Sequence, residues 1–135
     1  MAIYTCTAHE AALSSEQRTV IAAEITRIHC AHTGDRPNMV WVIFETLPPD
    51  SIFSGGKPAE NTVIVGLFRE RSAEVKAQVL NEICTMYKKV TGLSDDQLWV
   101  SLTEISSSDA MMFGALLPEV GHEDEWLAKL GLLDK

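Results

Sequence analysis

The sequence contains the same unit twice. Ser14 recurs as Ser72 and Trp41 recurs as Trp99, 58 residues later in both cases. Eight residues of the first half follow this rule, namely Ser14, Glu16, Glu24, Ile25, Thr33, Gly34, Trp41 and Val42; their counterparts are Ser72, Glu74, Glu82, Ile83, Thr91, Gly92, Trp99 and Val100. Roughly two identities would arise by chance over such a stretch. A repeat of this period indicates one supersecondary unit duplicated, so the architecture must be two copies of that unit.

The first unit predicts a strand, a helix and a second strand. Ala2–Ala8 and Met39–Thr46 are rich in the β-branched and apolar residues that favour strands. Between them, a capping box at Ser14 predicts a helix start, and Gly34 predicts its end just after His32. The face of this helix expected to be buried consists of Ile21, Ile25, Ile28 and His32, with His29 beside them.

The second unit repeats this order. Strands are predicted at Thr62–Phe68 and Leu98–Ile105, and Ser72 is the expected cap of the helix between them. Its inner stripe is expected to be Val75, Val79, Ile83, Met86 and Val90. The prolines and glycines between the units predict a long loop with a hairpin near Ser54-Gly55-Gly56. We expect one domain over 1–135, with a first unit and loop at 1–59, a second unit at 60–109 and a tail at 110–135.

Two β-α-β units side by side predict an α/β (α+β) fold. Each helix carries the chain to a parallel neighbouring strand, which gives a four-stranded mixed sheet with both helices on one face. The other face then needs a cover. Because the tail is short, it can cover only part of that face, and we expect oligomerisation to cover the rest.

Composition excludes several function classes. With 11 Lys and Arg against 19 Asp and Glu, the net charge is −8, and no basic cluster offers a surface for nucleic acid or an anionic membrane. No apolar run is long enough to span a bilayer, and no secretory signal is visible, so we expect a cytoplasmic protein. Three cysteines make no paired motif. His29 and His32 lack a third ligand at metal-binding spacing, so we expect neither a metal nor another cofactor.

Several segments, in order along almost the whole chain, match a known family. They are Ile3-Tyr4, Ala23–Thr26 with His29, Phe53–Gly56, Arg69–Ser72, Leu98–Val100, Phe113–Pro118, Gly121–Glu123 and Glu125-Trp126. In these segments the chain resembles the tautomerase superfamily, most closely the branch typified by cis-3-chloroacrylic acid dehalogenase. The resemblance implies two fused β-α-β halves, a homotrimer and a small carboxylate or dicarbonyl substrate.

The chemistry of this family uses an amino-terminal proline as general base or acid, and this chain departs from that pattern. Residue 2 is Ala2, which would expose a primary amine with a pKa near 8 only if Met1 were removed. The resemblance carries over His29 as an assisting histidine. It also carries over Arg69 and Arg71 as the pair that binds the substrate carboxylate, with one residue fewer between them. An extended backbone would keep both arginines on one face.

Two further positions argue against dehalogenation. In the family's dehalogenase branch a tyrosine and a glutamate activate water, and here those positions hold Ser101 and Met112. Neither side chain can take over that proton transfer. Ser101 and Met112 are therefore candidates for lining a substrate pocket that is larger and more apolar.

Two hypotheses follow. The first is an enzyme with altered chemistry, an isomerase or tautomerase, hydratase or decarboxylase acting on a carboxylate or 1,3-dicarbonyl compound. The second is a catalytically silent trimeric member that binds small anions or serves in assembly. The residues leave structural alternatives open: His29 as a satisfied buried group, and the arginines as strand-end charges paired with Glu70 or Glu74. The run His122–Glu125 has the composition of a solvated turn.

Overall fold

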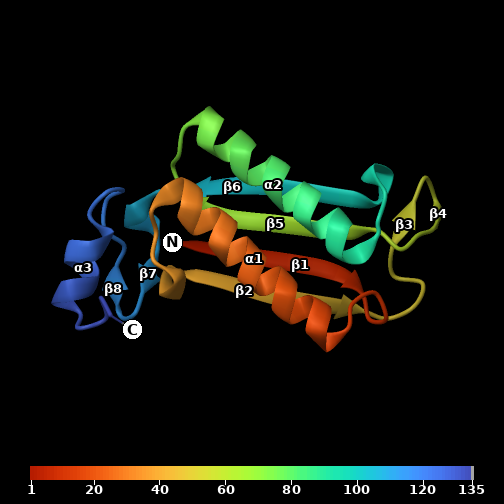
Figure 1. Ribbon diagram of the computed structural model, residues 1–135, viewed down its shortest axis with the longest axis horizontal. Helices are drawn as coiled ribbons and strands as arrows, with labels where there is room; N and C mark the ends of the chain where they lie inside the picture. Colours follow the sequence, from red (N-terminus) through yellow and green to blue (C-terminus); the bar gives the residue numbers. More distant parts are fainter. Residues whose placement is uncertain (135) are drawn as a thin grey trace.

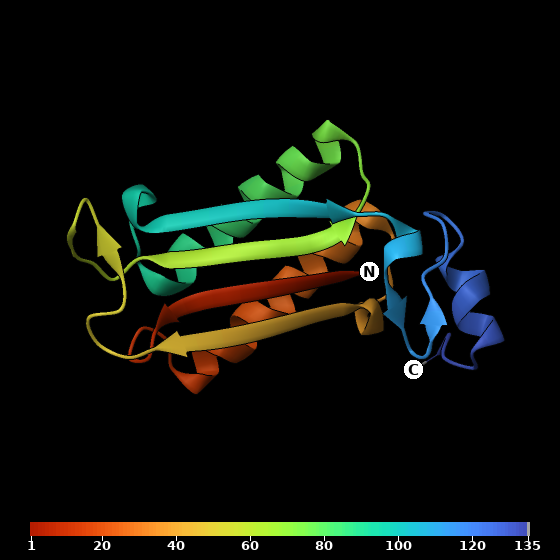
Figure 2. The same cartoon turned by 180° about the vertical axis from the view of Figure 1, so that it is seen from behind.

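The computed structural model describes residues 1–134. Its central sheet has four strands in the order β2-β1-β5-β6, and both long helices lie on one face of it (Figures 1 and 2). The bounds are β1 Ala2–His9, α1 Ser15–Thr33, β2 Val40–Leu47, β5 Thr62–Arg69, α2 Ala73–Thr91 and β6 Leu98–Ile105. β1 is parallel to β2 and β5 to β6, whereas β1 and β5 are antiparallel. The predicted mixed sheet of two fused β-α-β units is confirmed.

Short elements connect and extend these units. They are η1 Pro37–Met39, β3 Phe53–Ser54, β4 Lys57–Pro58, η2 Asp95–Gln97, η3 Ser107–Asp109, β7 Met111–Met112, β8 Ala115–Leu116 and α3 Glu123–Lys129. β3 and β4 form the hairpin expected in the long loop. Within residues 1–134, no helix is both long enough and apolar enough to cross a membrane.

Both long helices begin and end where the local sequence dictates. Ser14 accepts a hydrogen bond from the Gln17 amide and completes a capping box, and the Ser72 side chain accepts from the Val75 amide at the start of α2 without a capping box. Each helix ends at a left-handed glycine, Gly34 or Gly92, whose φ of 77° or 76° a side chain would oppose. The helix boundaries in the two units are therefore set by the repeat itself.

The buried face of α1 differs from the expected one by one residue. Ile21, Ile25 and Ile28 are buried as predicted, but the fourth buried residue is His29. His32 lies at the surface, where its Nε2 atom contacts the Glu82 carboxylate. Four residues after Ile28, His32 still lies on the isoleucine stripe, but it stands in the last turn of α1, where it contacts α2 and its side chain stays 23% exposed. In α2 the buried residues are Val79, Ile83, Met86 and Tyr87.

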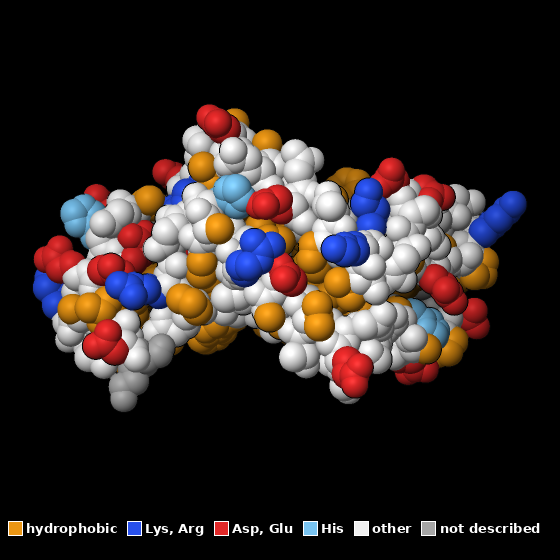
Figure 3. Space-filling model, viewed as in Figure 1, with side chains coloured by type: hydrophobic (Ala, Val, Ile, Leu, Met, Phe, Trp, Pro, Cys, Tyr) orange, Lys and Arg blue, Asp and Glu red, His pale blue; other side chains and the backbone are white. Residues whose placement is uncertain are grey.

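The two faces of the molecule have different surfaces. Over the helices, acidic and basic side chains are intermixed (Figure 3). The opposite face of the sheet exposes a set of apolar side chains, Trp41, Ile43, Val63, Val65 and Trp99. The described part of the tail, up to residue 134, does not cover them: β7, β8 and α3 pack beyond the end of the sheet, beside the amino terminus (Figure 2). This face is therefore left without a cover in a single chain.

Candidate active site

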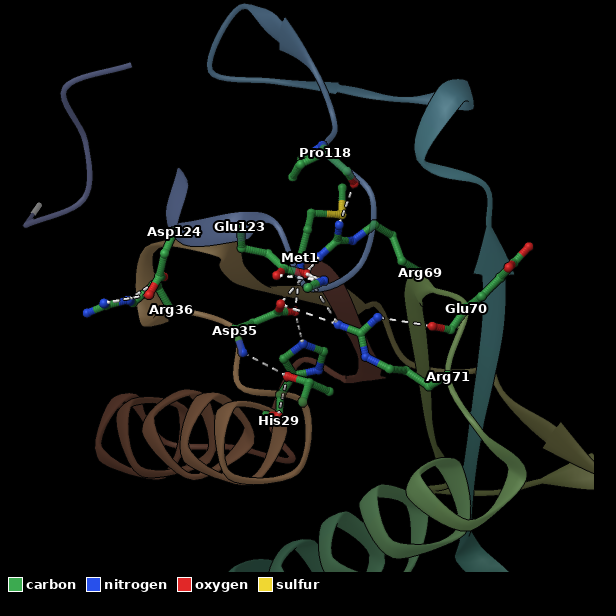
Figure 4. A network of polar contacts seen from close by, with 12 residues as sticks. Met1, His29, Asp35, Arg36, Arg69, Glu70, Arg71, Pro118, Glu123 and Asp124 are labelled. Atoms are coloured by element: carbon green, nitrogen blue, oxygen red, sulfur yellow. Dashed lines mark hydrogen bonds and ion pairs between the residues drawn. The ribbon is translucent and has the colours of Figure 1, made fainter. Parts of the chain in front are cut away.

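A buried cluster of charged groups gathers at the start of the chain (Figure 4). The amino group of Met1 lies just before β1, His29 comes from α1, and Asp35 from the segment just after the α1 cap. Arg69 ends β5, and Arg71 follows it. β1 begins and β5 finishes at this same end of the sheet because the two strands are antiparallel, so side chains distant in sequence converge here.

Asp35 is the centre of the cluster. Its Oδ2 atom accepts from the Met1 amino group and from His29 Nε2, the latter at 2.8 Å. Its Oδ1 atom accepts from Nη2 of Arg69 and Nη2 of Arg71, both at 3.3 Å. Burial alone would raise the pKa of this carboxyl, but the His29 hydrogen bond and the positive amino terminus outweigh burial and hold the pKa well below its usual range. Asp35 is therefore a buried anion.

His29 is neutral and has both ring nitrogens occupied. Since ionised Asp35 can only accept, Nε2 carries the ring hydrogen, and Nδ1 accepts from the Tyr4 hydroxyl at 2.9 Å. Burial lowers the pKa of His29, although the Asp35 contact opposes this. Burial also raises the pKa of Tyr4, which keeps its hydroxyl as a donor. His29 thus links the core to Asp35.

The two arginines differ in their solvent exposure and in their hydrogen-bond partners. Arg69 has a side chain only 1% exposed and donates to the Pro118 carbonyl at 2.7 Å, to Glu123 at 2.5 Å and to Asp35. Its Nε atom is buried without a hydrogen-bond partner among the described residues. Arg71 is 8% exposed and donates to the Glu70 carbonyl and to Asp35. Arg71 is therefore the guanidinium nearer to solvent.

Glu123 corrects the expectation of a solvated turn at His122–Glu125. Its carboxylate pairs with Arg69 and accepts from the Gly121 amide at 2.9 and 3.1 Å. Burial raises the pKa of Glu123, but the Gly121 amide and Arg69 outweigh it, so the pKa lies below its ordinary value. Its neighbours Asp124 and Glu125 are exposed, as expected. One residue of the acidic run therefore belongs to the cluster.

The charges of the cluster do not cancel when the amino group is protonated. Three cations, the Met1 ammonium, Arg69 and Arg71, face the two carboxylates Asp35 and Glu123, while His29 is neutral. One positive charge is in excess. Burial is the largest influence on the Met1 amino group and lowers its pKa below 8.0, against the opposing pull of Asp35. The site can reach neutrality by losing that proton or by gaining one anion.

The other predicted site residues fall in two places. Ala2 is fully buried within the sheet, and Met112 packs with Met1 in an apolar cluster. The other buried members of that cluster are Met39, Leu117 and Leu127. Ser101 lies opposite Val65 in the register of β5 and β6, on the open face of the sheet and outside the charged cluster. No group of three His, Cys, Asp or Glu side chains within 1–134 is placed to hold a metal.

Asp35 was missed by sequence reasoning, yet the repeat carries a signal for it. The position 58 residues later is Leu93, directly after the α2 cap. The two positions make equivalent hydrogen bonds. Thr33 Oγ1 accepts from the Asp35 amide at 3.2 Å, and Thr91 Oγ1 accepts from the Leu93 amide at 3.3 Å. A charged residue at the repeat position of a core-packed leucine predicts a buried charge, which then needs partners.

Comparison with known proteins decides the family. The profile described as "Putative oxalocrotonate tautomerase enzyme" matches residues 1–129. The chain belongs to the tautomerase superfamily. This tautomerase-superfamily chain is similar to the solved structure of native Ps01740, with 33% identity, a TM-score of 0.80, and coverage of 82% of this chain and 99% of that one. It also matches N1, a member of the cis-3-chloroacrylic acid dehalogenase family, with 28% identity, a TM-score of 0.87, and coverage of 93% and 90%.

A more distant match shows the fold alone. The F6 fused 4-OT wild-type asymmetric trimer is 15% identical to this tautomerase-superfamily chain, with a TM-score of 0.78 and coverage of 84% of this chain and 94% of that one. No curated protein matches the chain. The resemblance to the cis-3-chloroacrylic acid dehalogenase-like branch, predicted from sequence segments, is confirmed.

Proposed function

We propose that this protein is an enzyme that moves a proton on a small carboxylate or 1,3-dicarbonyl compound, as an isomerase or tautomerase does. The observation that carries the proposal is the amino group at the start of the chain, held on Asp35 within a cluster that has one positive charge in excess. This excess belongs to the protonated amine; with the amine as the free base the cluster is neutral, and a substrate carboxylate would bind to Arg71, the guanidinium nearer to solvent. Hydration or decarboxylation of the same substrates uses the same groups and is a variant of this proposal.

The proton transfer needs a base and an oxyanion partner. An amine whose pKa is lowered by burial has more of its free-base form at neutral pH, which suits general-base catalysis. The amine removes a proton from the carbon beside a carbonyl: the C–H bond breaks, an N–H bond forms, and the electron pair moves to the carbonyl oxygen. Arg71 stabilises that oxygen or holds the carboxylate, and the ammonium returns the proton to another atom.

The remaining site residues position the groups that carry out the proton transfer. His29 and Asp35 position the amine, Arg69 supports the anion site, and Met112 supplies an apolar wall beside Met1. If Met1 is removed, Ala2 becomes the base, about 3.5 Å further along the strand. Ser101 takes part in substrate binding only if a second copy of the chain brings a site to the open sheet face.

We also propose a homotrimer in the cytoplasm. The fused 4-OT structures similar to this chain are described as symmetric or asymmetric trimers. The exposed Trp41 and Trp99 on the open sheet face are the kind of surface that subunit contacts bury. Free cysteines at positions 6, 30 and 84 suit a reducing compartment.

The test combines mass spectrometry with proton NMR. Intact mass first shows which residue carries the free amine. Phenylenolpyruvate, 3-oxo acids, acetylenic acids and the chloroacrylates are then incubated with the protein in D₂O, and deuterium incorporation or product formation is followed. We expect turnover that falls at least a hundredfold in Arg71→Ala and persists in Arg27→Ala, an exposed arginine on α1. Absence of turnover with every substrate would contradict the proposal.

A second candidate is a catalytically silent trimer that binds small anions or serves in assembly. One observation favours it: Arg69 already donates to three acceptors of the protein itself, Pro118, Asp35 and Glu123. In that case carboxylates would bind through Arg71 without any deuterium incorporation or product. The NMR experiment therefore separates the two candidates, because binding shifts and turnover are read from the same spectra.

A further inference from the structure

A cavity of about 580 Å³ lies at the carboxyl end of β6. Its volume is within the range of small-molecule sites, roughly 300–1,000 Å³. Its lining is half apolar and half polar, and consists of Glu70, Ile105, Ser106, Ser107, Ser108, Leu116, Leu117, Glu119 and Val120. None of the residues named above as the proton-transfer machinery lines it. The cavity is therefore a second compartment.

The cavity and the charged cluster share a wall. Glu70 lies between Arg69 and Arg71, and its carbonyl accepts from Arg71 Nη1 at 3.0 Å. The Glu70 side chain points away from the cluster (Figure 4). On the other side, Leu117 both lines the cavity and belongs to the apolar cluster around Met1. Arg71 therefore contacts a lining residue of the cavity through the Glu70 carbonyl, although Arg71 itself does not line the cavity.

The charges of the lining restrict what can enter. Two carboxylates, Glu70 and Glu119, line the cavity, and among residues 1–134 no Lys or Arg lines it. A second carboxylate on a ligand would meet like charge there, with no cation to balance it. The three serine hydroxyls can donate and accept hydrogen bonds, and Ser106 and Ser108 already lie 3.0 Å apart. The lining thus suits an uncharged chain that carries a hydroxyl or carbonyl group.

We propose that this cavity receives the uncharged distal part of a monocarboxylate anchored on Arg71, and that Glu70 and Glu119 exclude dicarboxylates. The inference rests on the proposed function, because it takes the binding of a substrate carboxylate by Arg71 as given. It adds the class of substrate: a monocarboxylate with a neutral, polar tail of a few carbons.

The charge rule is tested by titrating the full-length protein with pentanoate, 5-hydroxypentanoate and glutarate, which share a five-carbon chain. We expect both monocarboxylates to bind at least tenfold more tightly than glutarate. The double variant Glu70→Gln with Glu119→Gln should bring the difference within about threefold, because it tightens the binding of glutarate more than that of pentanoate. The control, Glu10→Gln with Glu60→Gln, changes two exposed glutamates elsewhere and should leave the tenfold difference intact.

Filling the cavity tests the placement. Ser108 is exposed at the rim, so Ser108→Trp should fold and weaken pentanoate binding about tenfold while leaving acetate, which needs only Arg71, unaffected. Val120→Trp is a second filling variant from the opposite wall. If acetate binds through Arg71 but neither the two Trp variants nor the double Glu→Gln variant alters selectivity, the cavity proposal is wrong, while the proposed function still stands. If no carboxylate binds through Arg71, the proposed function falls with it.

Discussion

His29 and Tyr87 occupy equivalent positions in the two halves, and each makes one buried hydrogen bond to the first strand of its own half. Tyr4 joins His29 at 2.9 Å, and Tyr87 donates to Thr62 at 3.2 Å, with partners 25 residues apart in both cases. The repeat thus supplies a buried polar pair twice. Only in the first half is this pair extended by Asp35, because the second half has Leu93 at that position. The charged cluster is built on a feature of the scaffold.

Asp35 should be the residue on which the stability of the cluster most depends. Asp35→Asn leaves the Met1 ammonium, Arg69 and Arg71 facing Glu123 alone, and removal of one partner from a buried ion pair is strongly destabilising. We expect a loss of about 3 kcal/mol in the free energy of unfolding, measured by urea denaturation. Asp95→Asn, which removes the exposed partner of Lys88, is the control and should cost under about 1 kcal/mol. Equal losses in the two variants would contradict the central role of Asp35.

The cluster also predicts how stability changes with pH. The folded-state pKa values of the Met1 amine, His29, Asp35 and Glu123 all lie below their ordinary values. As the pH falls, each group is therefore protonated in the unfolded chain before it is protonated in the folded one: the amine near pH 8, His29 near pH 6.5, and the two carboxylates near pH 4. Unfolding free energy should rise from pH 4 to pH 8, measured as urea midpoints at each pH. A midpoint that stays constant or falls over this range would argue against the buried cluster.

Gly66 makes room for Tyr4 and so for the orientation of His29. A Cβ atom at Gly66 would lie 2.6 Å from Tyr4 Cε1 and 2.8 Å from Leu102 Cδ2. Gly66→Ala should displace the Tyr4 ring, cost about 1–3 kcal/mol, and shift the imidazole NMR signals of His29. Gly55→Ala has open space but a positive φ of 58°, so it should cost stability through the backbone and leave those signals in place. Unmoved His29 signals in Gly66→Ala would refute this packing.

Sequence reasoning succeeded where the determinants are local. The caps at Ser14, Gly34 and Ser72 and most of the apolar face of each helix depend on residues a few positions apart; the predicted faces differ from the structure in the placing of His32 and in missing Tyr87. His29, Arg69 and Arg71 came from the family resemblance. The rest required tertiary structure: Glu123 stands in an acidic run, and nothing local distinguishes it from Asp124, whose side chain is 60% exposed. Burial of that one carboxylate is decided by Arg69, 54 residues away.

The open face of the sheet predicts how the protein assembles. Trp99 is 64% exposed and Val63, its register partner on β5, is 39% exposed, so a charged residue in this surface would oppose its burial between subunits. We expect Trp99→Glu to shift the mass measured by light scattering from that of the proposed trimer to that of a monomer, with the circular dichroism spectrum retained. Val20→Glu places the same charge on the helix side, where Val20 is 47% exposed, and should leave the trimer intact. A Trp99→Glu protein that stays trimeric would show that subunits meet elsewhere, and Ser101, on the same face, would then have no second copy beside it.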